Sequence, residues 1–186
     1  MASSARCLLL ISALLIAAGC AGTGPVVERS MSGVDNYSEI DGAETFAGTQ
    51  VGFGGKTAPE AMASLKAAGY TTVISLRAES EKGVDHAASR QAAQAAGLNY
   101  VVIPLSPDEF SPAAVDEALE ALSSADRQPV YLHCGSASRA GAVWMIGRVS
   151  LDGLSRQKAA AEMRAIAAKP EAAQAFAESY LDSRGE

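Results

Sequence analysis

Residues 130–140 read VYLHCGSASRA and give the clearest indication of the architecture of the protein. Its first four residues form a short apolar run that ends in a histidine, as expected of a buried strand. Gly, Ser and Ala residues follow, and after Arg139 an apolar pattern continues to about residue 151, which predicts a helix. The stretch therefore predicts a strand, a tight loop and a helix, with Cys134 at the carboxyl end of the strand.

The rest of the chain repeats the alternation of strand and helix. β-branched or apolar runs bounded by Gly or Pro predict strands at 71–76 and 100–103, and the weaker pattern at 46–48 and 51–53 predicts one or two short strands. Periodic segments predict helices at 57–68, 84–96, 111–122, 155–168 and from 170 to about 182. Thr57 with Glu60, and Ser111 with Pro112, are expected to cap two of these helices. The fold class predicted is α/β, with a mainly parallel central sheet flanked by helices.

Length and composition agree with one globular domain. The chain has 186 residues, of which 48% are hydrophobic and 19% charged, and its net charge is −6. This size supports a single hydrophobic core. The acidic balance does not favour nucleic acid or anionic lipid as a partner.

The N-terminus carries a targeting signal. Arg6 precedes an apolar run over 7–18, which is too short to span a membrane but suits the core of a signal peptide. The run ends in Ala-Ala-Gly before Cys20, which resembles the bacterial lipobox, where the cysteine thiol is lipidated. The alternative is an ordinary secretory leader that is cut near Ala21.

These features divide the chain into three parts. Residues 1–19 are the predicted lipoprotein signal peptide, 20–36 a tether, and 37–186 the α/β domain. No Asp follows Cys20, and by resemblance to lipoprotein sorting this favours the outer membrane of a bacterial cell envelope, with the domain facing the periplasm.

Processing leaves one free thiol. Of the three cysteines, Cys7 leaves with the leader and lipid occupies Cys20, so Cys134 stays unpaired in a compartment where cysteines usually oxidise in pairs. A lone cysteine can be a small core residue. The loop that follows Cys134 instead favours a nucleophile.

The loop has the composition of an anion-binding site. Backbone N–H groups at a helix start converge on one point, and here they would come from Gly135, Ser136, Ala137 and Ser138. Arg139 would add a fixed fork of donors. A helix N-terminus and a nearby cation also favour the thiolate form of a cysteine, which is the nucleophile. His133 is expected to point inward and support the loop by hydrogen bonds.

His-Cys, a small loop, Arg139 and then GAVW resemble the cysteine-dependent phosphatase-like domains of bacteria. These include the dual-specificity-phosphatase-like family and the beta-lactamase hydrolase-like protein, phosphatase-like domain group. Further segments that resemble this family are 36–37, 48–50, 73–79 and 97–104. The resemblance implies a three-layer phosphatase-like domain and a protein-tyrosine or dual-specificity phosphatase-like hydrolase acting through a cysteinyl-phosphate intermediate.

Two positions depart from that family. Phosphatases of the superfamily have five residues between Cys and Arg, whereas this loop has four, which is the spacing of rhodanese sulfurtransferases and of part of the bacterial phosphatase-like group. Position 140 is Ala, where a phosphatase often has a hydroxyl that supports release of the thiolate. A sulfurtransferase that forms a persulfide on Cys134, and a non-catalytic anion-binding or interaction module, are therefore the alternatives.

A phosphatase also needs a general acid for the leaving oxygen. Asp108 follows the neighbouring strand and is the predicted acid, with Glu109 as a weaker choice. Arg77 and Glu79 are expected to pair with each other, with a reach into the pocket as the alternative, and His86 is expected to be solvated. The sequence predicts no metal and no cofactor, and a phosphorylated protein or small molecule as substrate.

Overall fold

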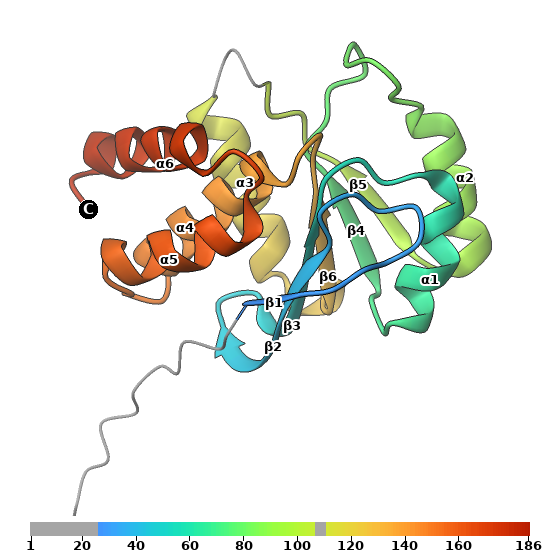
Figure 1. Cartoon of the computed structure of the whole chain (residues 1–186), viewed down its shortest axis with the longest axis horizontal. Coiled ribbons are helices and arrows are strands. Elements are labelled where there is room, and N and C mark those ends of the chain that lie inside the picture. The colour runs from blue at the N-terminus through green and yellow to red at the C-terminus, as the bar shows by residue number, and fades with distance from the viewer. Residues whose placement is uncertain (1–25, 107–110) are drawn as a thin grey trace, which may run out of the picture.

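The computed structural model describes residues 26–106 and 111–186 (Figure 1). Within these residues six strands form one sheet in the order β1-β2-β3-β6-β4-β5. The strands are β1 Val26–Glu28, β2 Ser38–Thr45, β3 Gly48–Gly54, β4 Thr72–Ser75, β5 Asn99–Val102 and β6 Val130–His133. β6 lies between β3 and β4, so its carboxyl end is flanked on both sides.

The sheet is parallel over four strands and antiparallel at one edge. β3, β6, β4 and β5 run parallel to one another, whereas β1, β2 and β3 pair antiparallel. Only two residues connect β2 to β3, and a connection this short can join only antiparallel strands. The prediction of a mainly parallel α/β sheet is confirmed.

Helices cover both faces of the sheet (Figure 1). On one face lie α1 Met62–Ala67, which a 3-10 turn at Pro59–Ala61 precedes, and α2 His86–Ala96. On the other lie α3 Pro112–Ser123, α4 Ser138–Ser150, α5 Arg156–Ile166 and α6 Pro170–Arg184. The three-layer arrangement follows from a parallel sheet, which has two apolar faces to cover.

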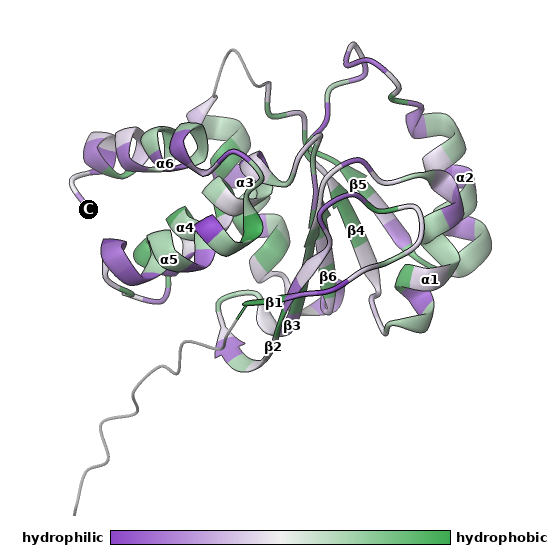
Figure 2. Cartoon of the chain, in the orientation of Figure 1, coloured by the Kyte–Doolittle hydropathy of each residue, from purple (hydrophilic) through white to green (hydrophobic). Residues whose placement is uncertain are grey.

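β6 divides its side chains between two hydrophobic cores. Val130 and Leu132 pack into the larger core under α3–α6, and Tyr131 packs into the smaller core under α1 and α2. Figure 2 shows the hydrophobic colours concentrated on the strands and on the helix faces that meet them. Because side chains alternate along a strand, His133 and Cys134 continue the pattern on opposite faces.

One of the two predicted helix caps forms. The Ser111 hydroxyl accepts a hydrogen bond from the Ala114 amide at the start of α3. The cap predicted at Thr57 is wrong, because its hydroxyl donates instead to the Gly55 carbonyl and meets the Tyr131 hydroxyl. Ala58 occupies the N-cap position and has no side-chain oxygen to offer.

The sheet begins earlier than residue 37. β1 lies inside the range predicted as a tether, where Val26 and Val27 pair with β2 and Val26 packs against the larger core. β-branched side chains and a free strand edge explain this pairing. Residues 1–25, including Cys20, are outside the described part of the chain, and no helix within that part is both long and apolar enough to cross a bilayer.

Candidate active site

The loop after β6 is held between its two neighbouring strands. The Cys134 amide donates to the Gly54 carbonyl at 3.1 Å, and the His133 carbonyl accepts from the Leu76 amide at 2.8 Å. Ser136 forms an isolated antiparallel bridge with Gly55. The ends of β3 and β4 therefore set the position of the loop at the carboxyl edge of the sheet, where ligands of open α/β sheets bind.

The loop turns into α4 at Ala137, which has a left-handed φ of +61°. Segments from the C-terminal half close against it. The Ser136 carbonyl accepts from the Ala168 amide, and the Ser138 hydroxyl accepts from the Lys169 amide at 2.9 Å. The turn places the N-terminus of a 13-residue helix at the loop, and such a terminus favours an anion.

Cys134 is a free thiol and is fully buried. Its side chain belongs to the larger core, beside the start of α4. The thiol is therefore shielded from solvent in this structure.

Arg139 is fixed by four hydrogen bonds. Its Nη1 donates to the carbonyls of Leu76 at 3.0 Å and Leu105 at 2.7 Å, and to Glu81 Oε1 at 2.7 Å. Its Nη2 donates to Glu81 Oε2 at 2.8 Å. Burial lowers the pKa of the guanidinium, but the interactions with Glu81 and Cys134 raise it overall, so the side chain stays charged. The guanidinium is thus held in one orientation beside the loop.

Glu81 is a site residue that the sequence analysis missed. It joins Arg139 to Arg77, whose Nε lies 3.3 Å from Glu81 Oε2, and it accepts from the Ala78 amide. Burial raises the pKa of its carboxyl, but the hydrogen bond and charge of Arg139, with the other two partners, lower it to about 2. The only signal in the sequence was its position two residues after Glu79 in an acidic run that follows β4.

Two predictions about the neighbouring rim are wrong. Arg77 pairs with Glu81 and donates to the Lys82 carbonyl, whereas Glu79 is 75% exposed and comes no closer than 3.9 Å to His86. His86 is not solvated, because its ring contacts the Arg77 carbonyl at 3.0 Å and the Tyr100 hydroxyl at 3.1 Å. Both differences arise in the loop 76–85, because the path of this loop cannot be predicted from local sequence patterns.

His133 points away from Cys134, toward the face of α1 and α2. Its Nδ1 lies 3.2 Å from the Gly55 carbonyl and donates to it. Burial lowers the pKa of the ring to about 4, so the imidazole is neutral at pH 7 and its Nε2 is an acceptor. Within the described residues that Nε2 is buried and has no hydrogen-bond partner.

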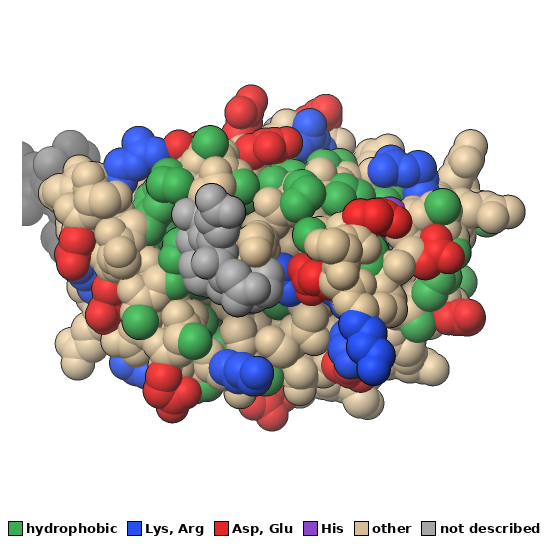
Figure 3. Space-filling model, turned by 90° about the horizontal axis from the view of Figure 1, so that it is seen from above, with side chains coloured by type: hydrophobic (Ala, Val, Ile, Leu, Met, Phe, Trp, Pro, Cys, Tyr) green, Lys and Arg blue, Asp and Glu red, His purple; other side chains and the backbone are tan. Residues whose placement is uncertain are grey.

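Figure 3 looks onto the edge of the sheet where the loop lies, and acidic and basic side chains are interspersed around it. Asp108 and Glu109 are outside the described residues, in the segment that follows Ser106. No group of three or more His, Cys, Asp or Glu side chains within 26–106 and 111–186 is arranged to hold a metal ion.

Comparisons with known proteins agree on the kind of domain. Residues 46–151 match the model of the family described as beta-lactamase hydrolase-like protein, phosphatase-like domain. No curated protein sequence matches the chain.

Solved structures share the fold at low sequence identity. TpbA from P. aeruginosa is 20% identical with a TM-score of 0.61, over 82% of this chain and 88% of that one. The catalytic domain of the PP-IP phosphatase SIW14 from S. cerevisiae, in complex with citrate, is 17% identical with a TM-score of 0.63, over 83% and 91%. A DUF442 protein from Shewanella putrefaciens CN-32 is 20% identical with a TM-score of 0.59, over 79% and 93%.

Proposed function

The chain belongs to the family of the beta-lactamase hydrolase-like protein, phosphatase-like domain, and from this premise we propose that it is a phosphomonoester hydrolase with Cys134 as nucleophile. The observation that carries the proposal is the position of Arg139. Its guanidinium is buried beside the loop and is oriented by Glu81 and two backbone carbonyls. A preoriented cation of this kind stabilises the charge of a transferring phosphoryl group.

The reaction has two steps. The Cys134 thiolate attacks phosphorus, the P–O bond to the leaving group breaks, and the leaving oxygen takes a proton from a general acid. Water then attacks the cysteinyl phosphate, the S–P bond breaks, and the thiolate and inorganic phosphate are released. Arg139 and the backbone amides of residues 135–138 would bind the phosphoryl oxygens in both steps.

Asp108 is the proposed acid. It lies three residues beyond Leu105, whose carbonyl accepts from Arg139, so its segment starts beside the site. Asp108→Asn should lower kcat/KM for phenyl phosphate, whose leaving group needs a proton, more than for a nitrophenyl ester, whose leaving group does not. Equal effects on both esters would remove Asp108 from this role.

The direct test uses the purified protein with phenyl phosphate. The unaltered protein should release phosphate, and Cys134→Ser should lose at least about a thousandfold in kcat. Thiosulfate with cyanide is the parallel substrate pair for sulfur transfer. Thiocyanate formation without phosphate release would contradict the proposal, and so would full activity in the serine variant. The melting temperatures of both proteins serve as the control for folding.

The four-residue spacing of the loop predicts which of the two chemical steps is slower. A loop with four residues between Cys134 and Arg139 has one fewer backbone amide than the phosphatase loop that it resembles. Ala140 supplies no hydroxyl for release of the thiolate. Hydrolysis of the cysteinyl phosphate should therefore be the slower step, and an initial burst of phenol should precede steady turnover.

The structures with a similar fold support a phosphate ester as the class of substrate. One TpbA structure is a complex with phosphotyrosine, and SIW14 is named a PP-IP phosphatase. A phosphorylated protein or a small phosphorylated molecule is the proposed partner.

The cellular location is proposed from the leader. A lipid on Cys20 would anchor the domain to the membrane, facing the periplasm. Cys20→Ser should release the protein into the soluble fraction after cell breakage, and persistent sedimentation with membranes would contradict lipidation.

A further inference from the structure

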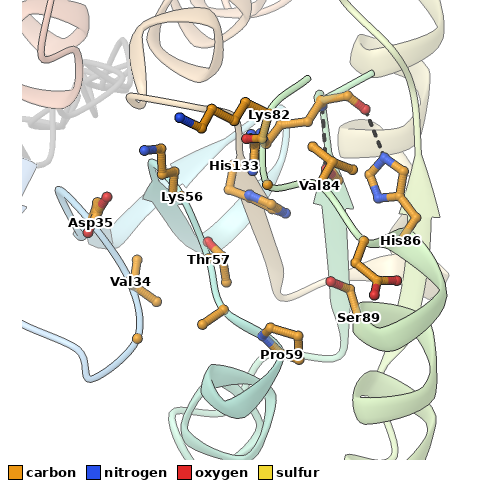
Figure 4. Close-up of a pocket in the computed structure, with 16 residues that line it drawn as sticks. Val34, Asp35, Lys56, Thr57, Pro59, Lys82, Val84, His86, Ser89 and His133 are labelled. Atoms are coloured by element: carbon orange, nitrogen blue, oxygen red, sulfur yellow. Dashed lines mark hydrogen bonds between the residues drawn. The ribbon is translucent and has the colours of Figure 1, made fainter. Parts of the chain in front are cut away.

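A pocket of about 650 Å³ opens at the carboxyl edge of the sheet, on the face that α1 and α2 cover (Figure 4). Its walls come from residues 33–35, 56–59 and 82–86, and from Ser75, Arg77, Ser89 and His133. This volume lies within the range of small-molecule sites. The pocket is distinct from the loop itself, since Cys134 points to the opposite face.

An unsatisfied acceptor lies in this pocket. His133 is 3% exposed, its Nδ1 donates to Gly55, and its Nε2 lacks a partner within the described residues. A buried polar atom without a hydrogen bond costs free energy that a ligand donor would recover. A ligand that fits here therefore presents an O–H or N–H group to His133.

Cations stand at the mouth of the pocket. Lys56 and Lys82 are exposed lining residues, and Figure 4 shows their side chains extending to the same side of the pocket. Arg77 also lines it, but Glu81 and the Lys82 carbonyl occupy its guanidinium. Two carboxylates, Asp35 and Asp85, line the pocket as well, so the ionised lining carries a net charge of about +1 at pH 7. The two lysines are the cations available to an anion.

The pocket adjoins the candidate active site through three segments. Lys56 follows Gly55, which bridges to Ser136 of the loop. Lys82 follows Glu81, which binds Arg139, and His133 precedes Cys134. A molecule whose phosphate lies at Arg139 can therefore extend into this pocket.

We propose that the pocket binds the leaving group of the substrate, and that this group is a polyol with a second anionic group. The proposal rests on the proposed function. The hydroxyls donate to His133 Nε2, and the second anion lies at Lys56 and Lys82. A phosphotyrosine residue fits less well, because its aromatic leaving group brings no donor to the histidine.

The test compares fructose 1,6-bisphosphate with phenyl phosphate as substrates of the full chain. The ratio of their kcat/KM values should fall by about tenfold in Lys56→Gln and in Lys82→Gln, since each loses one cation–phosphate contact. Lys158→Gln removes the same charge from exposed α5 and should leave the ratio unchanged. An unchanged ratio in the pocket variants, or an equal fall in the Lys158 variant, would overturn the proposal.

A binding experiment distinguishes failure of this proposal from failure of the proposed function. If neither ester is hydrolysed, the function fails, and the pocket is then judged with Cys134→Ser by calorimetric titration of fructose 1,6-bisphosphate. The dissociation constant of fructose 1,6-bisphosphate should rise by about tenfold when Lys56→Gln is added. Both histidines of the chain line the pocket, so the test uses the ¹⁵N signal of His133 Nε2 alone, which should shift on binding. Tighter binding of a phosphotyrosine peptide than of the bisphosphate would refute the polyol assignment.

Discussion

Arg139 and Glu81 form a buried pair whose members orient each other. The carboxylate binds both terminal nitrogens of the guanidinium, and the two N–H groups of Nη1 are shared between Glu81 and the carbonyls of Leu76 and Leu105. Gly135 lies against the pair, since a Cβ placed there would come within 3.3 Å of Arg139 Nη2. The loop and the ion pair are thus packed as one unit. Glu81 acts as a positioning residue for Arg139.

Glu81→Gln should reduce kcat for phenyl phosphate by about tenfold or more with a smaller change in KM. The amide keeps the size of the side chain but removes one acceptor and the charge that hold the guanidinium, and misplaced transition-state contacts act mainly on kcat. Steady-state kinetics measure the split. Glu79→Gln is the matched control because Glu79 is exposed and only two residues away. An equal loss in both variants would remove the positioning role.

The titration of His133 and Glu81 predicts how the free energy of unfolding changes as the pH falls. His133 has a pKa of about 4 in the folded protein against an ordinary 6.5, so the unfolded chain binds its proton first and stability falls as pH drops from about 6.5 to 4. Glu81 has a folded pKa of about 2 against 4.5, so its contribution is lost as pH falls from about 4.5 toward 2.

Urea unfolding at pH 7, 5 and 3 tests both groups. His133→Gln should flatten the loss between pH 7 and 5, which is on the order of 2 kcal/mol. Glu81→Gln should leave that interval unchanged and reduce the loss between pH 5 and 3. A Glu81 variant that alters the loss between pH 7 and 5, or a His133 variant that leaves that loss unchanged, would contradict the assignment.

At the scale of elements, β3 shows how a glycine pair makes room for a buried aromatic layer. Val51 and Phe53 face the larger core, and Gly52 and Gly54 face the opposite side. A Cβ on Gly52 would collide with the Tyr70 hydroxyl, and one on Gly54 with the Tyr131 hydroxyl. Both hydroxyls are hydrogen-bonded, Tyr70 to Tyr37 and Tyr131 to Thr57. The glycines therefore let the strand pass close beneath the tyrosines.

Gly52→Ala should destabilise the protein by about 2 kcal/mol or more, because both nearby rings are buried and have no free space to move. Chemical denaturation measures the change. Thr49→Ala on the same strand is exposed and should cost less than about 1 kcal/mol. Similar costs at both positions would mean that the tyrosines move aside easily.

Helix starts were predictable where the capping side chain has no other partner. Ser111 is exposed and caps α3 as its sequence position suggests. Thr57 has the same local signal, but Tyr131, 74 residues away in the chain, meets its hydroxyl. A local rule cannot anticipate that competitor.

For the whole molecule, β1 joins the N-terminal segment to the sheet. It extends the antiparallel edge beyond β2, and Arg29 lies 2.6 Å from Glu39 just after it. β1 covers a strand edge that would otherwise expose free backbone donors and acceptors. The segment between a lipid on Cys20 and this strand would then span only a few residues.

A chain that starts at Ser30 should unfold at lower urea concentration than one that starts at Val26, by about 1–2 kcal/mol, and should self-associate more. Three backbone pairs and the Arg29–Glu39 ion pair are lost, and the exposed edge of β2 can pair with another copy. Denaturation curves and sedimentation measure the two effects. Identical curves for both chains would show that β1 adds no stability.

The strand, loop and helix around Cys134, and the alternation that makes the sheet mainly parallel, can be predicted from local sequence patterns. These features depend on side-chain period, on Gly and Pro boundaries and on short spacing, all of which are local. Tertiary structure alone decided that Arg139 pairs with Glu81 and that His133 faces a pocket behind the loop. Those contacts arise because β6 lies between β3 and β4, which brings residues 55, 76 and 81 to the loop from distant parts of the chain.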